Sequence, residues 1–127
     1  MSEQQTILFV CLHGMGMSRV AAAFFNSSAP AGWRAVSAGL EPGESLSPTA
    51  ARLLAGTSAE TFLDRAAPRS IDSAPPADQV IAIRNPSIRF ELAGAVTWDL
   101  TSVEFDERMR DELEARAEQL AEQLSRG

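Results

Sequence analysis

The apolar residues of this sequence gather in short continuous runs, each bounded by glycine, proline or polar residues. Runs without apolar–polar alternation are typical of strands that are buried on both faces in a parallel sheet. They predict strands at 7–10, 33–37, 77–83 and near 96–98. The segment 57–76 contains three prolines and has no clear period, so we expect a loop with short helical turns there.

Other segments carry apolar residues three and four positions apart, which predicts helices. The predicted helices cover 19–27, 48–55 and 103–125, of which the last has the strongest period. Ser18 is a candidate N-cap for the first helix, and Ser47 followed by Pro48 supplies an N-cap and a first helical residue for the second. The sequence Thr-Ser-Val-Glu at 101–104 matches a capping box just before the third helix.

Strands and helices therefore alternate along the chain. This order predicts an α/β three-layer sandwich with a four-stranded parallel sheet and helices on both of its faces. The length of 127 residues and the apolar content of 45% fit one globular domain over residues 1–127. Ligands bind such sheets at the carboxyl ends of the strands, so the segment that follows the first strand is the first candidate for a site.

Composition excludes several classes of function. One cysteine and one histidine leave no disulfide framework and no zinc site of the usual ligand count, so we expect no metal. All eleven basic residues are arginine, which excludes lysine Schiff-base chemistry and the Gly-Lys-Ser/Thr nucleotide-binding loop, and we expect no cofactor. The net charge of −6 argues against binding to nucleic acid or to a membrane surface.

The sequence shows neither a signal peptide nor an apolar stretch of membrane-spanning length. We therefore expect a cytoplasmic location, in which Cys11 is a free thiol.

The loop after the first predicted strand joins a buried strand to a helix N-terminus, and this arrangement favours anions. The candidate anion-binding residues are Leu12, His13, Gly14, Met15, Gly16, Met17 and Ser18. A cysteine at the start of such a loop is favoured as a thiolate, so Cys11 is a candidate nucleophile toward phosphorus or arsenic. The alternative is that Cys11 is a small buried side chain that ends a strand.

The same residues carry a resemblance to a known family. The segment Leu-Phe-Val-Cys-Leu-His at 8–13, together with Ser18 and the Ala-Ala-Ala-Phe that begins at Ala21, resembles the opening of low-molecular-weight protein tyrosine phosphatases. It is closer still to the related thiol-dependent arsenate reductases, some of which have a Cys-Val-His-Asn-Ala-Gly-Arg-Ser-Gln loop. Further segments fit the family in order, namely Ser37-Ala38-Gly39, Glu41-Pro42, Arg69-Ser70, Ala77-Asp78 and Trp98-Asp99-Leu100. The resemblance implies the family's fold and a nucleophilic role for Cys11.

The chain departs from this family at the arginine of the loop. The family's Cys-x5-Arg-Ser pattern places at position 17 an arginine that binds the substrate oxyanion, and this chain has Met17 there. Arg19, two residues later, is a candidate replacement, although a helix turns roughly 200° over two residues. The alternative for Arg19 is a solvated surface side chain.

The general acid and the redox relay depart from the family as well. The Asp-Pro pair of the phosphatases falls at 102–103, which is Ser-Val here. Asp99 is the candidate acid that remains. Asp106 is interpreted instead as a residue in the first turn of the third helix, where the helix dipole favours a negative charge. A cascade of internal disulfides is excluded because Cys11 is the only thiol. His13 either helps to hold a Cys11 thiolate or makes a structural contact in the loop.

Three hypotheses follow for the function. The first is a degenerate family member that binds a small oxyanion, a phosphorylated ligand or a protein partner at the Cys11 loop, without efficient phosphatase or arsenate reductase activity. The second is an active phosphatase or arsenate reductase in which Arg19 or backbone amides hold the oxyanion. The third is a structural or interaction module, because Leu12, Met15 and Met17 give the loop an apolar mouth.

Overall fold

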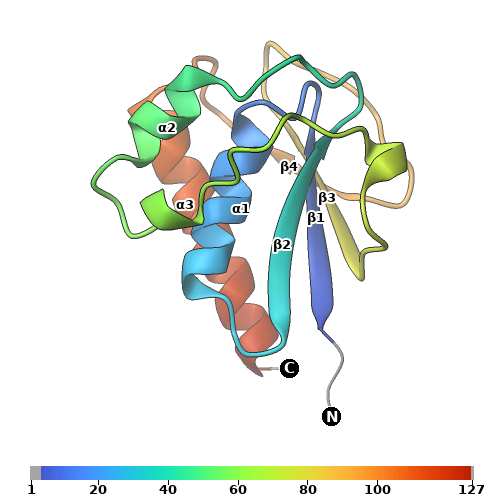
Figure 1. Cartoon of the computed structure of the whole chain (residues 1–127), viewed down its shortest axis with the longest axis vertical. Helices are drawn as coiled ribbons and strands as arrows, with labels where there is room; N and C mark the ends of the chain where they lie inside the picture. Colours follow the sequence, from blue (N-terminus) through green and yellow to red (C-terminus); the bar gives the residue numbers. More distant parts are fainter. Residues whose placement is uncertain (1–3, 127) are drawn as a thin grey trace.

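The computed structural model describes residues 4–126 and contains one sheet of four parallel strands (Figure 1). The strands are β1 (Gln5–Cys11), β2 (Trp33–Gly39), β3 (Gln79–Arg84) and β4 (Val96–Asp99). They lie in the order β2-β1-β3-β4, and every neighbouring pair is parallel. The predicted four-stranded parallel sheet is confirmed, and its first strand lies in the interior of the sheet.

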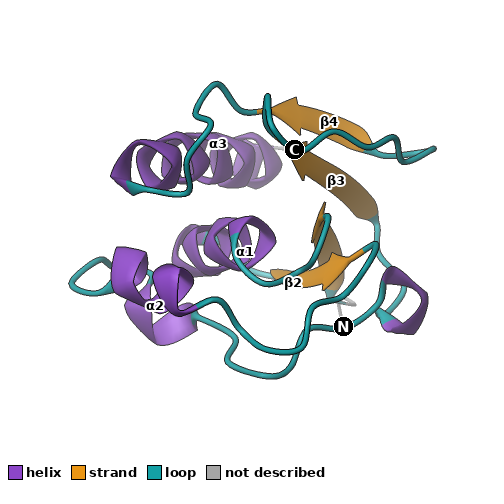
Figure 2. Ribbon diagram, turned by 90° about the horizontal axis from the view of Figure 1, so that it is seen from above, coloured by secondary structure: helices purple, strands orange, loops and turns teal. Residues whose placement is uncertain are grey.

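The sheet is the middle one of three layers. The helices α1 (Met17–Ser28), α2 (Pro48–Leu54) and α3 (Glu107–Arg126) all lie on one side of it (Figure 2). The other face is covered by a loop that contains the short 3₁₀ helix η2 (Ile71–Ser73), while a second one, η1 (Glu60–Phe62), contacts α1. The predicted sandwich is therefore confirmed, with a 3₁₀ helix rather than an α-helix in its third layer.

Strand β1 is buried on both faces, as its apolar run predicts. Ile7 and Phe9 belong to the larger core on the side of the α-helices, and Leu8 and Val10 belong to a smaller core on the opposite side. Side chains alternate along a strand, so Cys11 projects to the same side as Phe9 and joins the larger core. The last residue of β1 therefore presents its thiol beneath the start of α1.

The second helix begins as predicted, but the first does not. Ser47 occupies the N-cap position of α2 and Pro48 is its first helical residue. Helix α1, in contrast, begins at Met17 with Gly16 in the N-cap position, and Ser18 is fully buried in the first turn. The prediction of Ser18 as an N-cap is wrong, because its hydroxyl accepts a hydrogen bond from the Cys11 thiol instead.

Helix α3 begins four residues later than the period predicts, at Glu107, and the capping box at 101–104 does not form. The Asp106 carboxylate accepts hydrogen bonds from two N–H groups of the first turn and serves as the N-cap. The Glu112 carboxylate accepts from the N–H and hydroxyl groups of Thr101 and from the Ser102 N–H. Residues 100–106 therefore stay a loop that is tied to the side of the helix.

No helix in the described residues has both the length and the apolar character needed to cross a membrane.

Candidate functional site

The Cys11 loop joins the carboxyl end of β1 to the N-terminus of α1. The Cys11 side chain is 3% exposed, and its Sγ lies 3.1 Å from the Ser18 Oγ, to which the thiol donates. The loop forms one wall of a cavity of about 220 Å³. Ile88, from the segment after β3, and Phe105, from the segment before α3, contribute the facing wall. The structure thus brings a thiol, a helix N-terminus and a cavity together.

The carbonyl groups of the Cys11 loop are all hydrogen-bonded to groups outside the loop. Each carbonyl from residue 11 to residue 16 accepts one hydrogen bond of 2.8–3.3 Å. In chain order the donors are the N–H groups of Leu40, Glu41 and Gly43, the Arg19 Nε, and the N–H groups of Ser47 and Val20. The loop is therefore held in one conformation by its surroundings.

The N–H groups of the loop point the opposite way. In a trans peptide the N–H of one residue is antiparallel to the carbonyl of the residue before it, and the chain has no cis peptide in its described residues. Within residues 4–126, the N–H groups at positions 12–18 donate to no protein acceptor. Converging N–H groups that lack acceptors form a concavity for anions, and the N-terminus of α1 adds to its positive potential.

Two glycines allow the loop to lie directly against the end of β2. Gly14 has a φ of +64°, and a Cβ at this position would lie 2.8 Å from the Gly39 nitrogen. A Cβ at Gly39 would lie 2.6 Å from the His13 carbonyl carbon. Both distances are shorter than any ordinary carbon contact, so side chains at these two positions would push the loop and the strand apart.

Met17 stands where the resembling family has its oxyanion-binding arginine. Its side chain is 7% exposed and lines the cavity, with its sulfur 3.9 Å from the Asn85 Nδ2. No arginine lines this cavity, and Leu12, Met15, Ile88 and Phe105 make its surface largely apolar. The hydrogen-bond donors that the loop offers to the cavity are therefore backbone N–H groups and not a guanidinium.

Arg19 lies behind the loop, on the side of the carbonyls. It is 1% exposed, so the alternative of a solvated surface arginine is wrong. Its Nε donates to the Gly14 carbonyl at 2.9 Å, and its Nη1 donates to the Asp64 carbonyl at 2.5 Å. Burial lowers the pKa of the Arg19 guanidinium, although the Asp64 carboxylate acts in the opposite direction. The structure does not place Arg19 among the residues that line the cavity.

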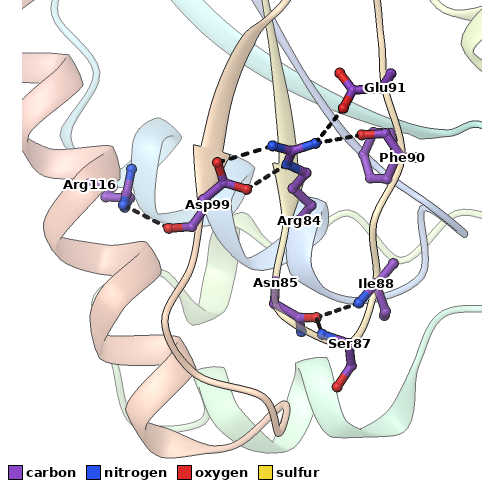
Figure 3. Close-up of polar contacts among 8 residues, drawn as sticks. All are labelled: Arg84, Asn85, Ser87, Ile88, Phe90, Glu91, Asp99 and Arg116. Carbon is purple, nitrogen blue, oxygen red and sulfur yellow. Dashed lines mark hydrogen bonds and ion pairs between the residues drawn. The ribbon is translucent and has the colours of Figure 1, made fainter.

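Asp99 lies in an ion pair away from the cavity. Its carboxylate oxygens lie 2.5 Å from the Arg84 Nε and 3.3 Å from the Arg84 Nη2, and Arg84 also binds Glu91 (Figure 3). Hydrogen bonds from Arg84 lower the pKa of Asp99. Asp99 therefore stays ionised near neutral pH, whereas a general acid must hold a proton.

The two other candidates have structural contacts. The Nδ1 of His13 lies 2.9 Å from the Glu41 carbonyl oxygen, and the residue is exposed. Of the two roles expected for His13, this contact corresponds to the structural one. Asp106 caps α3. Among the described residues no group of three His, Cys, Asp or Glu side chains is placed to hold a metal ion.

Asn85 is a site residue that the sequence analysis missed. It is buried, and its Oδ1 accepts from the N–H groups of Ser87 and Ile88 (Figure 3). Its Nδ2 donates to the Val103 carbonyl and faces the Met17 sulfur. Asn85 thus connects the two segments that form the facing wall of the cavity. The pair Asn85-Pro86 reads in the sequence only as the end of a strand.

Comparison with known proteins finds relatives by structure only. No protein-family model and no curated sequence matches this chain. An arsenate reductase from Archaeoglobus fulgidus is 28% identical and has a TM-score of 0.70, with 91% of this chain and 98% of that chain covered. A low-molecular-weight protein tyrosine phosphatase from T. tengcongensis is 21% identical, with a TM-score of 0.67 and coverage of 94% and 99%.

An arsenate reductase in its phosphate-binding state is 20% identical, with a TM-score of 0.73 and coverage of 96% of this chain and 100% of that chain. The order of elements and the position of the cysteine loop after β1 agree with the resemblance in the sequence. The chain therefore has the fold that is shared by these low-molecular-weight protein tyrosine phosphatases and arsenate reductases.

Proposed function

We propose that this protein binds a small oxyanion in the Cys11 loop through backbone N–H groups and does not transfer phosphoryl groups efficiently. The observation that carries the proposal is the set of N–H groups at positions 12–18 that have no protein acceptor within the described residues. Their direction is fixed by carbonyls that are already bonded elsewhere, so the loop presents its donors before any ligand arrives.

Two features of the site argue against efficient chemistry. Met17 offers no charge and no hydrogen-bond donor to the transition state, and the loss of one such donor costs about 10²–10³ in rate. None of the described carboxyl groups lines the cavity, and Asp99 is ionised and bonded to Arg84, so the site lacks a carboxylic acid of the kind that would protonate a leaving group.

A weak Cys11-dependent activity is the second candidate, and the contact between Cys11 and Ser18 favours it. If Cys11 loses its proton, the Ser18 hydroxyl at 3.1 Å can turn to donate to the thiolate and stabilise the nucleophile. This activity would be of the phosphatase or arsenate reductase type.

Calorimetric titration with phosphate, arsenate and vanadate tests the first proposal. We expect the wild-type protein to bind all three, and Met17→Arg to bind them about 10–100 times more tightly, since a charged hydrogen bond contributes about 1.5–3 kcal/mol. Met17→Leu is the matched control, because it keeps the apolar wall and should leave the affinity near that of the wild type.

Two results would contradict the proposal. If only Met17→Arg binds oxyanions, the wild-type loop is not an anion site, and a protein partner for its apolar mouth becomes the better explanation. If the wild-type protein hydrolyses an aryl phosphate rapidly and Cys11→Ser abolishes the activity, the protein is an efficient enzyme.

A further inference from the structure

Arg19 is the largest of the fully buried side chains, and full burial is rare for arginine. Its Nε and Nη1 are bonded to the Gly14 and Asp64 carbonyls, but its Nη2 is buried without a hydrogen-bond partner among the described residues. A buried group left unsatisfied is costly and calls for an explanation. Simple anchoring of the loop does not require a charged side chain, because a neutral donor could bind the Gly14 carbonyl.

The charge of Arg19 is only partly neutralised by its neighbours. The Asp64 carboxylate lies 3.8 Å from the Arg19 Nη1 but 3.2 Å from the Arg69 Nη2, so it is bonded to Arg69 and more distant from Arg19. Arg69 also donates to the Ser37 carbonyl at 2.8 Å. Two guanidinium groups share one carboxylate, and the cluster behind the loop therefore carries a net positive charge.

This charge is coupled to the loop in two ways. The Arg19 Nε holds the Gly14 carbonyl outward, which directs the N–H of Met15 inward and polarises that peptide group. Cys11 begins the same loop, so a positive charge held behind the loop also acts on its sulfur.

We propose that Arg19 is a positioning residue that provides, from behind the loop, the positive charge that Met17 does not provide inside the cavity. It orients the peptide between Gly14 and Met15, and its field favours negative charge on Cys11 and on a bound oxyanion. The oxyanion part rests on the proposed function, whereas the effect on the Cys11 thiol does not. The other titratable groups that face this region are Asp64 and Arg69 behind the loop and His13 at its rim.

The rate of alkylation of Cys11 by iodoacetamide as a function of pH tests the effect on the thiol. Cys11 is the only thiol in the chain, so the signal belongs to one residue. We expect Arg19→Met to raise the pH of half-maximal rate by about half a unit to one unit. Arg19→Lys keeps the charge and should stay close to the wild type. Arg110→Met is the matched control, since Arg110 also donates to a buried carbonyl, that of Leu53, away from the loop.

Asp64→Asn tests the same inference in the opposite direction. The amide keeps an oxygen for the Ala66 N–H but removes the negative charge, so we expect the pH of half-maximal alkylation to fall. The Asp64 side chain is 41% exposed, and this variant should fold even if Arg19→Met does not. A purely structural role for Arg19 would lower the thermal stability of Arg19→Met and would leave the pH profile of Asp64→Asn unchanged.

Vanadate titration of the same variants separates this inference from the proposed function. We expect Arg19→Met to bind vanadate about tenfold more weakly than the wild type and Asp64→Asn to bind it more tightly. If the pH profiles shift but the wild type binds no oxyanion, the inference about Arg19 stands and the proposed function fails. If the wild type binds vanadate and neither folded Arg19→Met nor Asp64→Asn shifts the alkylation profile, the inference about Arg19 is overturned.

Discussion

Replacement of Gly14 by alanine tests whether the close contact between the Cys11 loop and β2 holds the loop in place. At a φ of +64°, an alanine costs about 1–2 kcal/mol because its Cβ crowds the backbone in the left-handed region. The new Cβ would also lie 2.8 Å from the Gly39 nitrogen and 2.9 Å from the Ala38 carbonyl carbon. Neither backbone atom can rotate away, so loop and strand must separate, which adds about 1–3 kcal/mol.

The chain offers a matched control for the first of these two effects. Gly32 has a φ of +87°, and no other group of the described residues lies within 4 Å of a Cβ built on it. Gly32→Ala should therefore cost only about 1–2 kcal/mol, from the backbone conformation alone. The difference between Gly14→Ala and Gly32→Ala isolates the crowding against β2.

Urea unfolding followed by circular dichroism measures both variants, and vanadate titration measures the effect on the site. We expect Gly14→Ala to be about 2–5 kcal/mol less stable than the wild type and to bind vanadate more weakly, because its loop is displaced. Gly32→Ala should bind vanadate as the wild type does. Equal losses of stability in the two variants would refute the reasoning, since they would show that the loop yields to the new Cβ at no cost.

Three further predictions concern α3 and its N-terminus. Asp106→Ala should lower the free energy of unfolding by about 1 kcal/mol through loss of the N-cap, and Asp106→Asn should recover most of it in a urea titration. Glu112→Ala should cost about 1–3 kcal/mol, because the N–H groups of Thr101 and Ser102 lose their acceptor; a loss below 0.5 kcal/mol would contradict this role. Burial and nearby carboxylates raise the pKa of Glu114, so its ionisation opposes folding. Glu114→Gln should therefore melt at a higher temperature than the wild type near neutral pH. This gain should vanish at about pH 3, where Glu114 holds its proton in both the folded and the unfolded state.

The parts of the fold that depend on one strand or one helix face could be predicted from the sequence. The apolar run in β1 indicates burial on both sides, and burial of this kind places β1 in the interior of a sheet. The glycines after Cys11 likewise indicate a loop that can adopt a positive φ, and Gly14 has a φ of +64°. These signals are local, because they depend on side-chain periodicity and on backbone conformation alone.

The environment of Arg19 could not be predicted in this way. Its partner Asp64 lies 45 residues away in sequence, in a segment without any period. The prediction of where α3 begins was wrong for a related reason. The pattern at 101–104 suits a capping box, but Glu112 binds the N–H groups of Thr101 and Ser102, so the helix starts later. In both places a tertiary contact decides between two locally acceptable structures.

The bonding of the loop carbonyls has a consequence for how this site tolerates mutation. Five of the six donors that hold those carbonyls are backbone N–H groups, and only a proline can remove such a donor. Other substitutions among residues 40–47 change side chains around the loop without removing the bonds that hold it. The side chain at position 17 is not among those donors. The shape of the loop can therefore persist while its charge and chemistry diverge, as they have in a chain that carries methionine at position 17.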